Sequence, residues 1–527
     1  MNNYLLSLVP YLLYLLLKYR KSFHMLQQNS YNTSDRYIKW IFKNKNQVFF
    51  THEFLVILIY LSTIYFTGKF FAINILVYLV LFIVELKLTK TEQNKKPLVI
   101  TYRVKRLIFT IILLFLFITS YIYVNFNNLS IITISLIFFL FGYLSHMITF
   151  IGNTLNIPIE LIVYNKFLRK AKEKLSKRPN LKVIGIAGSY GKTSSKNILN
   201  SILNSKYISF ATPKSFNTPN GIVKTINDDL DKFSEIFIVE MGACKLDDIN
   251  ELCDIVNPKY GIITSIGISH LETFKTEENI QKGKFELIEN LPKDGIAVLN
   301  KDDTNQVNYK LKNKVKIIWI GIDNKKADIY ATDIKMSHEG LSFDVVIRRK
   351  KYKFETILLG RHNVYNILGS IALGLEFDIE IDKLQKAVKR LKPTEHRLEL
   401  KEQNGIYIID DAYNSNPVGS SYALEVLSMM PGKKIIVTPG MIELGEKEYE
   451  LNKAFGRQIA KVCDEIILVG EIKTKPILDG IKEEKYNLNK VHIINNVREA
   501  YILLNRLKKG KTYALFENDL LDTYNER

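Results

Sequence analysis

The chain has 527 residues, 47% of them hydrophobic and 24% charged, and a net charge of +19 at pH 7. This length corresponds to about three domains of ~100–200 residues, and the composition excludes a wholly disordered chain. The basic excess first suggests nucleic-acid binding. However, residues 1–180 contain 22 Lys+Arg and 6 Asp+Glu, a net of +16, whereas residues 181–527 contain 51 and 48, a net of +3. We therefore expect no nucleic-acid partner, and the charge must be explained within the first third.

The same first third contains long apolar runs. Residues 107–124 carry no charge, and in residues 129–151 only His146 is ionisable. Both runs are long enough to cross ~30 Å of hydrocarbon as helices. The shorter apolar runs of the region are residues 4–17, 54–66 and 70–86. We predict a transmembrane region over residues 1–164, with five helices, or four if the first does not cross.

Basic residues alternate between the connectors of this region. Three segments carry seven Lys or Arg each, whereas the two connectors that alternate with them, residues 67–69 and 125–128, contain only Lys69. Because basic loops stay cytoplasmic, we expect a multi-pass protein of the cell membrane whose catalytic body is cytoplasmic. The three basic segments are residues 18–45, 87–106 and 166–178. The last forms a predicted linker helix over residues 165–179, which either contacts anionic membrane lipids or is a solvated helix face.

A glycine-rich loop follows a buried strand at residues 182–187. The run GSYGKTSS leads into a helical pattern at 196–204, and such a helix N-terminus binds phosphate through backbone N–H groups. Lys192 would reach the terminal phosphates and the Thr193 hydroxyl would bind Mg²⁺. The strict P-loop spacing is not met, because position 186 is isoleucine; a chance glycine-rich turn is the alternative. The predicted nucleotide-binding residues here are Gly188, Ser189, Gly191, Lys192, Thr193 and Ser194.

Strands and helices then alternate, which predicts an α/β body with a parallel sheet. Glu240 ends one strand pattern and His270 follows another, so both are expected at the ligand-binding edge of the sheet as direct or water-mediated Mg²⁺ partners. We predict a P-loop central domain over residues 180–392, with a β-rich insertion at 327–358. A smaller Rossmann-like domain should follow over 393–527. Its predicted strands are 406–410, 434–438, 465–469 and 513–516, and its helices 418–429, 446–462 and 495–508.

Ordered motifs in this body resemble those of the Mur ligases, whose ATP loop departs from the strict spacing in the same way. The resemblance covers about residues 180–500 and is nearest to the MurF branch, which joins D-alanyl-D-alanine to UDP-N-acetylmuramoyl-tripeptide. The motifs, in chain order, are GSYGKTSSKN, SFNTPNGIVKTIN, IVEMGA, SHLETF, KGKFELIENL, VLNKDD, GRHNVYN, EHRLEL, IIDDAYNSNP and PGMIELGE.

The resemblance implies roles residue by residue. Lys192 and Thr193 would hold the β- and γ-phosphates and one Mg²⁺, and Glu240 and His270 would serve the metal ions. Lys284 matches the family lysine that is carbamylated to orient a second magnesium, although Lys282 lies only two positions away. Further roles are implied for Asn366 at the adenine, for Arg397 and Asp411 at the nucleotide once the domains close, and for Asn217, Asn414 and Asn416 at the substrates.

The implied chemistry is ATP-driven amide formation. A substrate carboxylate attacks the γ-phosphate, giving an acyl phosphate and ADP, and an amine then displaces phosphate. The implied cofactors are ATP and two Mg²⁺. The implied partners are a cell-wall or lipid-linked precursor with a free carboxylate and an amino acid or dipeptide amine. Lys192, His270, Lys284 and Arg397 are the expected catalytic residues. The three cysteines match no catalytic or metal-binding spacing, and we expect them to be reduced.

Two departures from the family leave the substrates open. Nothing in residues 1–180 resembles the family's UDP-sugar-binding domain, and the run ALFEND at 514–519 lacks a basic Lys-Gly-Ser-type string. We expect a membrane-associated acceptor. The alternatives are a ligase that modifies another envelope polymer or makes a poly-amino acid, and a non-catalytic nucleotide-binding scaffold for cell-wall enzymes. A transporter is disfavoured, because the apolar runs contain few charges.

Overall fold

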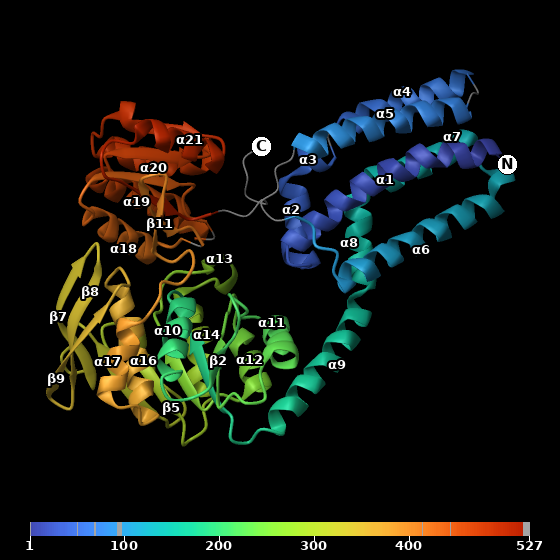
Figure 1. Ribbon diagram of the computed structural model, residues 1–527. Coiled ribbons are helices and arrows are strands. Elements are labelled where there is room, and N and C mark those ends of the chain that lie inside the picture. Colours follow the sequence, from blue (N-terminus) through green and yellow to red (C-terminus); the bar gives the residue numbers. More distant parts are fainter. Residues whose placement is uncertain are drawn as a thin grey trace. The chain divides into compact units, whose positions relative to one another are not determined.

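The computed structural model describes residues 2–49, 51–67, 70–91, 97–413, 415–442 and 444–519. The chain divides into two compact units, one up to Tyr164 and one from Asn165 to Asp519 (Figure 1). The first unit is helical, and the second contains two β-sheets with helices around them.

Helices alone make up the secondary structure of the described residues of the first unit. Their bounds are α1 (Asn2–Gln28), η1 (Thr33–Tyr37), α2 (Ile38–Lys43), α3 (Lys45–Val48), α4 (His52–Thr67), α5 (Phe70–Thr91), α6 (Tyr102–Val124), η2 (Phe126–Asn128), α7 (Ile131–Tyr143) and α8 (Ser145–Leu155). Helix α9 (Ile157–Ser176) begins in this unit and ends in the second, so the predicted basic linker helix is the C-terminal part of a longer helix.

Among the described residues, three helical segments are long and apolar enough to cross a membrane: Lys45–Thr67, Ala72–Thr89 and Tyr102–Val124. The run at 129–151, which we predicted as one span, is instead the helix pair α7 and α8, bent by 73°. The helix breaks at Leu144, whose φ of −87° and ψ of +23° leave helical geometry. The second helix of the pair buries polar side chains, including His146, whose Nδ1 is 2.9 Å from the Tyr37 hydroxyl. Helices α7 and α8 count as a fourth candidate span only if the two together cross the membrane.

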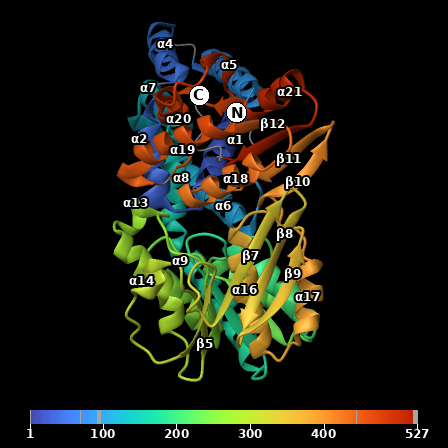
Figure 2. The same ribbon diagram turned by 90° about the vertical axis from the view of Figure 1, so that its left-hand side faces the viewer.

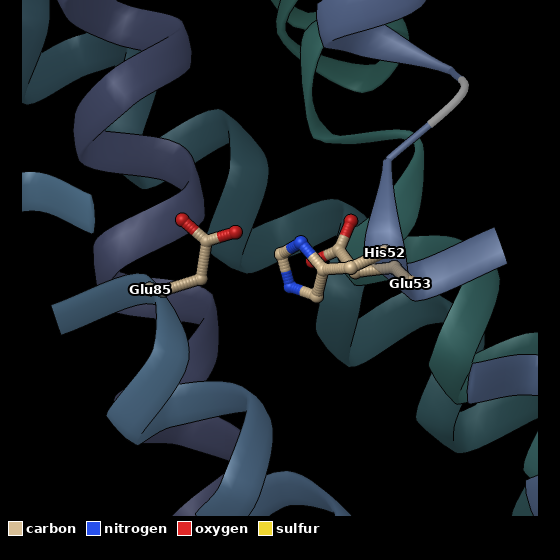
Figure 3. A group of neighbouring side chains, drawn as sticks. All are labelled: His52, Glu53 and Glu85. Atoms are coloured by element: carbon tan, nitrogen blue, oxygen red, sulfur yellow. The ribbon is translucent and has the colours of Figure 1, made fainter. Parts of the chain in front are cut away.

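A cluster of charged side chains lies inside the helical unit. Glu53 of α4 and Glu85 of α5 are buried, and their carboxylates lie with the imidazole of His52 within 4.8 Å of one another (Figure 3). Lys18 of α1 is also buried, with its Nζ 2.9 Å from Glu53 Oε2 and 3.7 Å from Glu85 Oε1. The Tyr14 hydroxyl donates to Glu53 Oε1 at 2.8 Å. Because an ammonium already supplies positive charge between the two carboxylates, we interpret the cluster as a pairing of three helices.

The larger sheet of the second unit has the strand order β2-β3-β1-β4-β5-β6-β7-β8-β9. Strands β1 to β7 pair in parallel, which confirms the predicted parallel sheet. Every side chain of β3 is buried, as expected for a strand covered on both faces. The strand bounds are β1 (Lys182–Ala187), β2 (Ser209–Ala211), β3 (Ile236–Glu240), β4 (Tyr260–Ile263), β5 (Ile296–Asn300), β6 (Lys316–Gly321), β7 (Ile329–Ser337), β8 (Gly340–Ile347) and β9 (Lys350–Thr356).

Helices cover both faces of this sheet. On one face, helices α10 and α16 pack together. On the other face, α12 and α14 contact each other, and α14 packs on β1 and β4. The predicted β-rich insertion is the antiparallel extension β7-β8-β9, which forms the long yellow strands of Figure 2. The helix bounds are α10 (Lys192–Leu203), α11 (Pro219–Lys224), η3 (Thr225–Asp229), α12 (Asp248–Val256), α13 (Leu271–Phe274), α14 (Glu277–Glu289), α15 (Thr304–Val307), α16 (His362–Glu376) and α17 (Ile381–Lys389).

The smaller sheet has the order β10-β11-β15-β12-β13-β14 and is parallel except for β10. Helices α18 to α20 pack on one face and α21 on the other, which gives the predicted Rossmann-like layering. Our prediction missed β10, β14 and α20. The bounds are β10 (Glu399–Gln403), β11 (Ile406–Asp411), α18 (Pro417–Ser428), β12 (Lys433–Thr438), η4 (Gly445–Lys447), α19 (Glu448–Val462), β13 (Glu465–Val469), α20 (Glu471–Glu483), η5 (Leu488–Lys490), β14 (Val491–Ile494), α21 (Val497–Leu507) and β15 (Thr512–Glu517).

Candidate active site

The glycine-rich loop connects β1 to the N-terminus of α10. Gly188 and Gly191 have φ of +145° and +78°, a region that side-chain-bearing residues rarely adopt. A Cβ at Gly188 would lie 2.1 Å from Thr264 Oγ1, so only glycine fits there. Lys192 begins α10 and donates its Nζ to the carbonyls of Gly188 at 2.7 Å and Ser189 at 3.2 Å. The loop therefore holds one lysine ammonium over a helix N-terminus.

Glu240 lies at the end of β3, and both of its carboxylate oxygens accept hydrogen bonds from neighbouring side chains. Its Oε1 accepts from Thr193 Oγ1 at 3.2 Å and from Asn217 Nδ2 at 3.1 Å. Its Oε2 accepts from Lys196 Nζ at 3.0 Å. Lys196 is buried, and burial lowers the pKa of its ammonium, opposed by the charge of Glu240. Lys196 belongs to the GSYGKTSSKN motif, but its position in the motif predicted no role for it.

Lys284 of α14 is buried, whereas the alternative Lys282 is exposed. The Nζ of Lys284 donates to the Ala243 carbonyl at 2.9 Å and lies 5.0 Å from the centre of the Phe274 ring. Burial, together with the positive charge of Lys192, lowers the pKa of Lys284 to about 7. A large fraction of this lysine is therefore an uncharged amine at neutral pH, the form that reacts with CO₂.

The C-terminal domain brings Arg397 and Asp411 to the same site. The Arg397 guanidinium lies over the Tyr413 ring, 4.4 Å from its centre. Asp411 Oδ1 accepts from the Leu398 N–H at 3.2 Å, and burial raises the pKa of Asp411 to about 6 although Arg397 opposes the shift. Glu517, which no sequence motif indicated, is the register partner of Asp411 on β15, and the two carboxyl groups hydrogen-bond each other.

Side chains from both domains line one cavity. Gly188 and Lys284 are not in its lining, and Asn414 lies outside the described residues. Among the described residues, the contacts that join the domains around it include Tyr413 to Ser215, Asn197 to Thr394 and Lys447 to Glu277. The predicted site residues that line the cavity are Ser189, Gly191, Lys192, Thr193, Ser194, Asn217, Glu240, His270, Asn366, Arg397, Asp411 and Asn416.

Some predicted residues have structural tasks in this conformation. The Asn416 side chain caps α18 by accepting from the Gly419 N–H at 2.8 Å. Asn366 donates to Asn363 Oδ1 at 3.1 Å, and its own Oδ1 would be 3.2 Å from a Cβ at Gly191, so it packs against the loop. His362 also lines the cavity but was not predicted; burial lowers its pKa to about 4, so its imidazole is neutral.

Comparison with known proteins identifies both domains. The Mur ligase middle domain matches residues 186–374, and the Mur ligase glutamate ligase domain matches residues 396–516. Through these two domains the chain belongs to the Mur ligase family. Enzymes of this family are ATP-dependent ligases that form ADP.

Relatives from the MurF branch resemble this chain over the same region. The chain is 33% identical to UDP-N-acetylmuramoyl-tripeptide–D-alanyl-D-alanine ligase of Bacillus subtilis over 53% of its own length and 60% of that protein. It is 29% identical to the ligase of the same name from Buchnera aphidicola, over 67% of this chain and 76% of the relative. A MurF ligase from Thermotoga maritima, solved in complex with ADP, has 26% identity and a TM-score of 0.61, covering 69% of this chain and 82% of that one. The chain thus matches about three-fifths of the length of the Bacillus subtilis ligase.

Proposed function

We propose that this protein is an ATP-dependent ligase that forms an amide bond between the carboxylate of a cell-wall precursor and an incoming amine. The observation that carries the proposal is the shared cavity, in which the glycine-rich loop and Glu240 of one domain face Arg397 and Asp411 of the other. Support also comes from the MurF-named relatives, which act on UDP-N-acetylmuramoyl-tripeptide and D-alanyl-D-alanine according to their names. We take this pair as the first substrates to test.

The loop has the features needed to bind the phosphates of ATP. The first N–H groups of α10 have no partner within the helix and point toward the loop, where the helix dipole also favours negative charge. Lys192 currently donates to two loop carbonyls, and these bonds can be exchanged for bonds to a phosphate oxygen. Lys192 is half-buried at the cavity, so less water screens its charge there than on an open surface.

The residues of the site fit magnesium. Thr193 Oγ1 and Glu240 Oε1 lie 3.2 Å apart at the cavity, and hydroxyl and carboxylate oxygens are the ligands that Mg²⁺ prefers. His270 lines the same cavity. Lys284, once carbamylated, would offer carboxylate-like oxygens for a second ion. The ions would supply charge neutralisation on the phosphates, while Lys196 holds the carboxylate of Glu240 in place.

The proposed reaction has two steps, and no nucleophile of the enzyme takes part. The substrate carboxylate attacks the γ-phosphorus, the bond to the β-phosphate oxygen breaks, and an acyl phosphate and ADP form. The amine then attacks the acyl carbon, and phosphate leaves. Lys192 and Arg397 stabilise the negative charge on the transferring phosphoryl group, and the two domains hold the reactants in line.

We further propose that the helical unit anchors the enzyme as a multi-pass protein with its ligase domains in the cytoplasm. The three apolar helical segments support this, as do the basic connectors before and after them. A membrane-held ligase is suited to an acceptor that is itself membrane-associated, such as a lipid-linked precursor. The matched family domains begin only at residue 186, so the part of the chain that would select the acceptor differs from that of the soluble relatives.

Hydroxylamine trapping tests the proposed chemistry without knowledge of the amine. The purified full chain in detergent is given ATP, Mg²⁺ and hydroxylamine, with either UDP-N-acetylmuramoyl-tripeptide or its lipid-linked form as acceptor. An ATP-dependent acyl hydroxamate is expected, formed faster with the lipid-linked acceptor, and absent from Lys192→Ala. No hydroxamate with either acceptor would overturn the ligase proposal for this precursor. A hydroxamate that forms at least as fast with the UDP-linked acceptor as with the lipid-linked one would overturn the membrane-associated acceptor.

A further inference from the structure

Arg397 lies in a strained stretch of backbone at the edge of the cavity. The residues on either side of it, His396 and Leu398, have φ of +58° and +47°, in the left-handed region that residues with a side chain rarely adopt. His396 is also the third residue of a turn, which the Arg397 N–H closes by donating to the Thr394 carbonyl at 3.0 Å. Glycine or asparagine usually occupies a turn position with positive φ. Bonds from the surrounding structure must therefore hold this stretch in place.

Two consecutive acids of β11 supply such bonds, one on each side of Arg397. The Nδ1 of His396 lies 2.8 Å from Asp410 Oδ2, and the Leu398 N–H donates to Asp411 Oδ1 at 3.2 Å. Side chains of consecutive strand residues point to opposite faces of the sheet, so one of the two bonds lies on each face. The backbone before and after Arg397 is thus tied to a single strand.

The bond between His396 and Asp410 involves an ionised carboxylate. Lys401 Nζ also binds Asp410 Oδ2, at 2.9 Å. Burial acts to raise the pKa of Asp410, but the bonds from Lys401 and His396 outweigh it and hold this pKa below its ordinary value. Because an ionised carboxylate only accepts hydrogen bonds, Nδ1 of His396 must carry the proton between them. The Asp410 side chain is 13% exposed and that of His396 46% exposed, so a largely buried carboxylate fixes an imidazole at the surface.

This stretch of backbone determines where the Arg397 guanidinium lies. Arg397 lines the cavity together with Lys192 of the glycine-rich loop, whereas His396 and Asp410 are not in the lining. The guanidinium lies 4.4 Å from the centre of the Tyr413 ring. A long arginine side chain on a mobile backbone would lose much conformational entropy on binding a phosphate, and a fixed backbone reduces that loss. His396 therefore affects the site through Arg397.

We propose that His396 is a positioning residue for Arg397: its bond to Asp410 holds the turn that directs the guanidinium toward the γ-phosphate of the bound nucleotide. This inference rests on the proposed ligase function, in which Arg397 stabilises the transferring phosphoryl group. His396 itself touches neither the nucleotide nor the substrates. It contributes by fixing the backbone from which Arg397 acts, because stabilisation of a transferring group depends on exact placement of the charge.

Substitutions at His396 separate the bond to Asp410 from the backbone conformation. His396→Gly adopts the positive φ freely but has no group that reaches Asp410. His396→Asn tolerates the same φ, and its Nδ2 is bonded to Cγ as Nδ1 of histidine is, so it can donate to Asp410 from the same place. His492→Ala is the matched control, because His492 pairs with a carboxylate in the same sheet, with its Nε2 3.1 Å from Glu465 Oε2, and is not in the cavity lining.

Nucleotide binding reports the position of the guanidinium without turnover. The full chain in detergent, with Mg²⁺, is titrated with ADP and with a non-hydrolysable ATP analogue, and the ratio of the two Kd values measures the contact with the γ-phosphate. We expect Arg397→Ala to reduce the preference for the ATP analogue by about tenfold or more and His396→Gly to reduce it by about threefold or more. His396→Asn and His492→Ala should keep the preference within about twofold of the wild type.

A double variant tests whether His396 acts through Arg397. Two residues that act as one unit have non-additive effects, so His396→Gly/Arg397→Ala should match Arg397→Ala within about twofold. Additive effects would overturn the proposal, and so would a wild-type ratio in His396→Gly or in Arg397→Ala. A His396→Asn variant that loses as much as His396→Gly would overturn it as well. Asp410→Ala is expected to repeat the loss of His396→Gly and replaces that variant if it does not fold.

Hydroxylamine trapping separates the positioning role from the ligase function. Where the wild type forms a hydroxamate, we expect His396→Gly to slow its formation by about threefold or more and His396→Asn to restore the rate. An unchanged rate in His396→Gly would overturn the positioning role alone. No hydroxamate from the wild type, together with the expected nucleotide ratios, would overturn the ligase proposal and support the positioning of Arg397 at the γ-phosphate.

Discussion

The ammonium of Lys196 and the carboxylate of Glu240 form an ion pair of 3.0 Å inside the central domain, with 1% and 2% of the two side chains exposed. The same carboxylate accepts bonds from Thr193 and Asn217 at the edge of the cavity. One buried lysine on α10 therefore fixes the acidic end of β3 relative to the glycine-rich loop.

Replacing Lys196 by methionine is expected to destabilise the second unit by about 3–5 kcal/mol, because Glu240 keeps its charge in a buried site without a counter-ion. The double variant Lys196→Met/Glu240→Gln should recover most of that loss. Thermal unfolding of the full chain in detergent measures both. Lys312→Met, which removes an 81% exposed lysine, should change stability by less than about 1 kcal/mol. A double variant no more stable than Lys196→Met would contradict this account.

Lys284 and Lys282 provide a matched test of carbamylation. The pKa of Lys284 is lowered to about 7, so its neutral, CO₂-reactive fraction grows as the pH rises through that value. We expect Lys284→Ala to lose about 10²-fold or more of the ligase rate, whereas the exposed Lys282→Ala keeps it. Removing CO₂ from the buffer should slow the wild type, and ¹³C-bicarbonate should give a carbamate signal in the NMR spectrum that Lys284→Ala lacks. An unchanged rate without CO₂, together with no such signal, would rule out carbamylation.

The positive φ of Gly188 and its contact with Thr264 predict the effect of adding a methyl group there. Gly188→Ala should weaken the binding of a fluorescent ATP analogue by about tenfold or more, because the loop must shift to separate the new Cβ from Thr264 Oγ1. Gly510 also has a positive φ, but its Cβ would meet no atom within 4 Å. Gly510→Ala should therefore cost only about 1 kcal/mol of stability and leave nucleotide affinity as it is. Equal affinities of the two variants would argue against the loop as the phosphate site.

The raised pKa of Asp411 predicts that replacing this residue by a neutral one stabilises the protein at high pH. Its pKa in the folded chain is about 6, above the value of 3.8 for an ordinary aspartate, so the folded state binds its proton more tightly than the unfolded state. Stability from this group is present below about pH 4 and is lost as the pH rises through about 6. Asp411→Asn should therefore raise the melting temperature at pH 8, by an amount equivalent to about 3 kcal/mol or less, and not at pH 4. A lower melting temperature at pH 8 would show that the charged form is stabilising.

Most of the ligase fold could be predicted from the sequence because its signals are local. Buried runs such as 182–187 and 465–469 read directly as strands, and the glycines at 188 and 191 mark a turn that only they can adopt. Strand β10, rich in charged residues, and helix α20, which contains Pro476, gave no such pattern and were missed. The apolar run at 129–151 carried no sign of the break at Leu144.

The site residues that lie within a recognisable sequence motif were predicted. The site residues that only the fold brings next to the others were missed. Lys196 becomes notable through its burial against Glu240, 44 positions away. Glu517 becomes notable because β15 inserts next to β11, which puts it beside Asp411 across more than a hundred residues of chain. Neither burial nor register of this kind can be read from local spacing, so Lys196 and Glu517 emerged only from the structure.

The charge cluster of Lys18, Glu53 and Glu85 has a consequence for how the protein is made. The three residues stand on α1, α4 and α5, and each would be a lone buried charge if its helix packed before the others. Helix α1 therefore cannot bury Lys18 beside any carboxylate before residue 53 has been synthesised, nor beside both carboxylates before residue 85 has been synthesised. Packing of these three helices should thus be a concerted event, and a chain truncated between Glu53 and Glu85 should leave Lys18 of α1 without its second carboxylate partner.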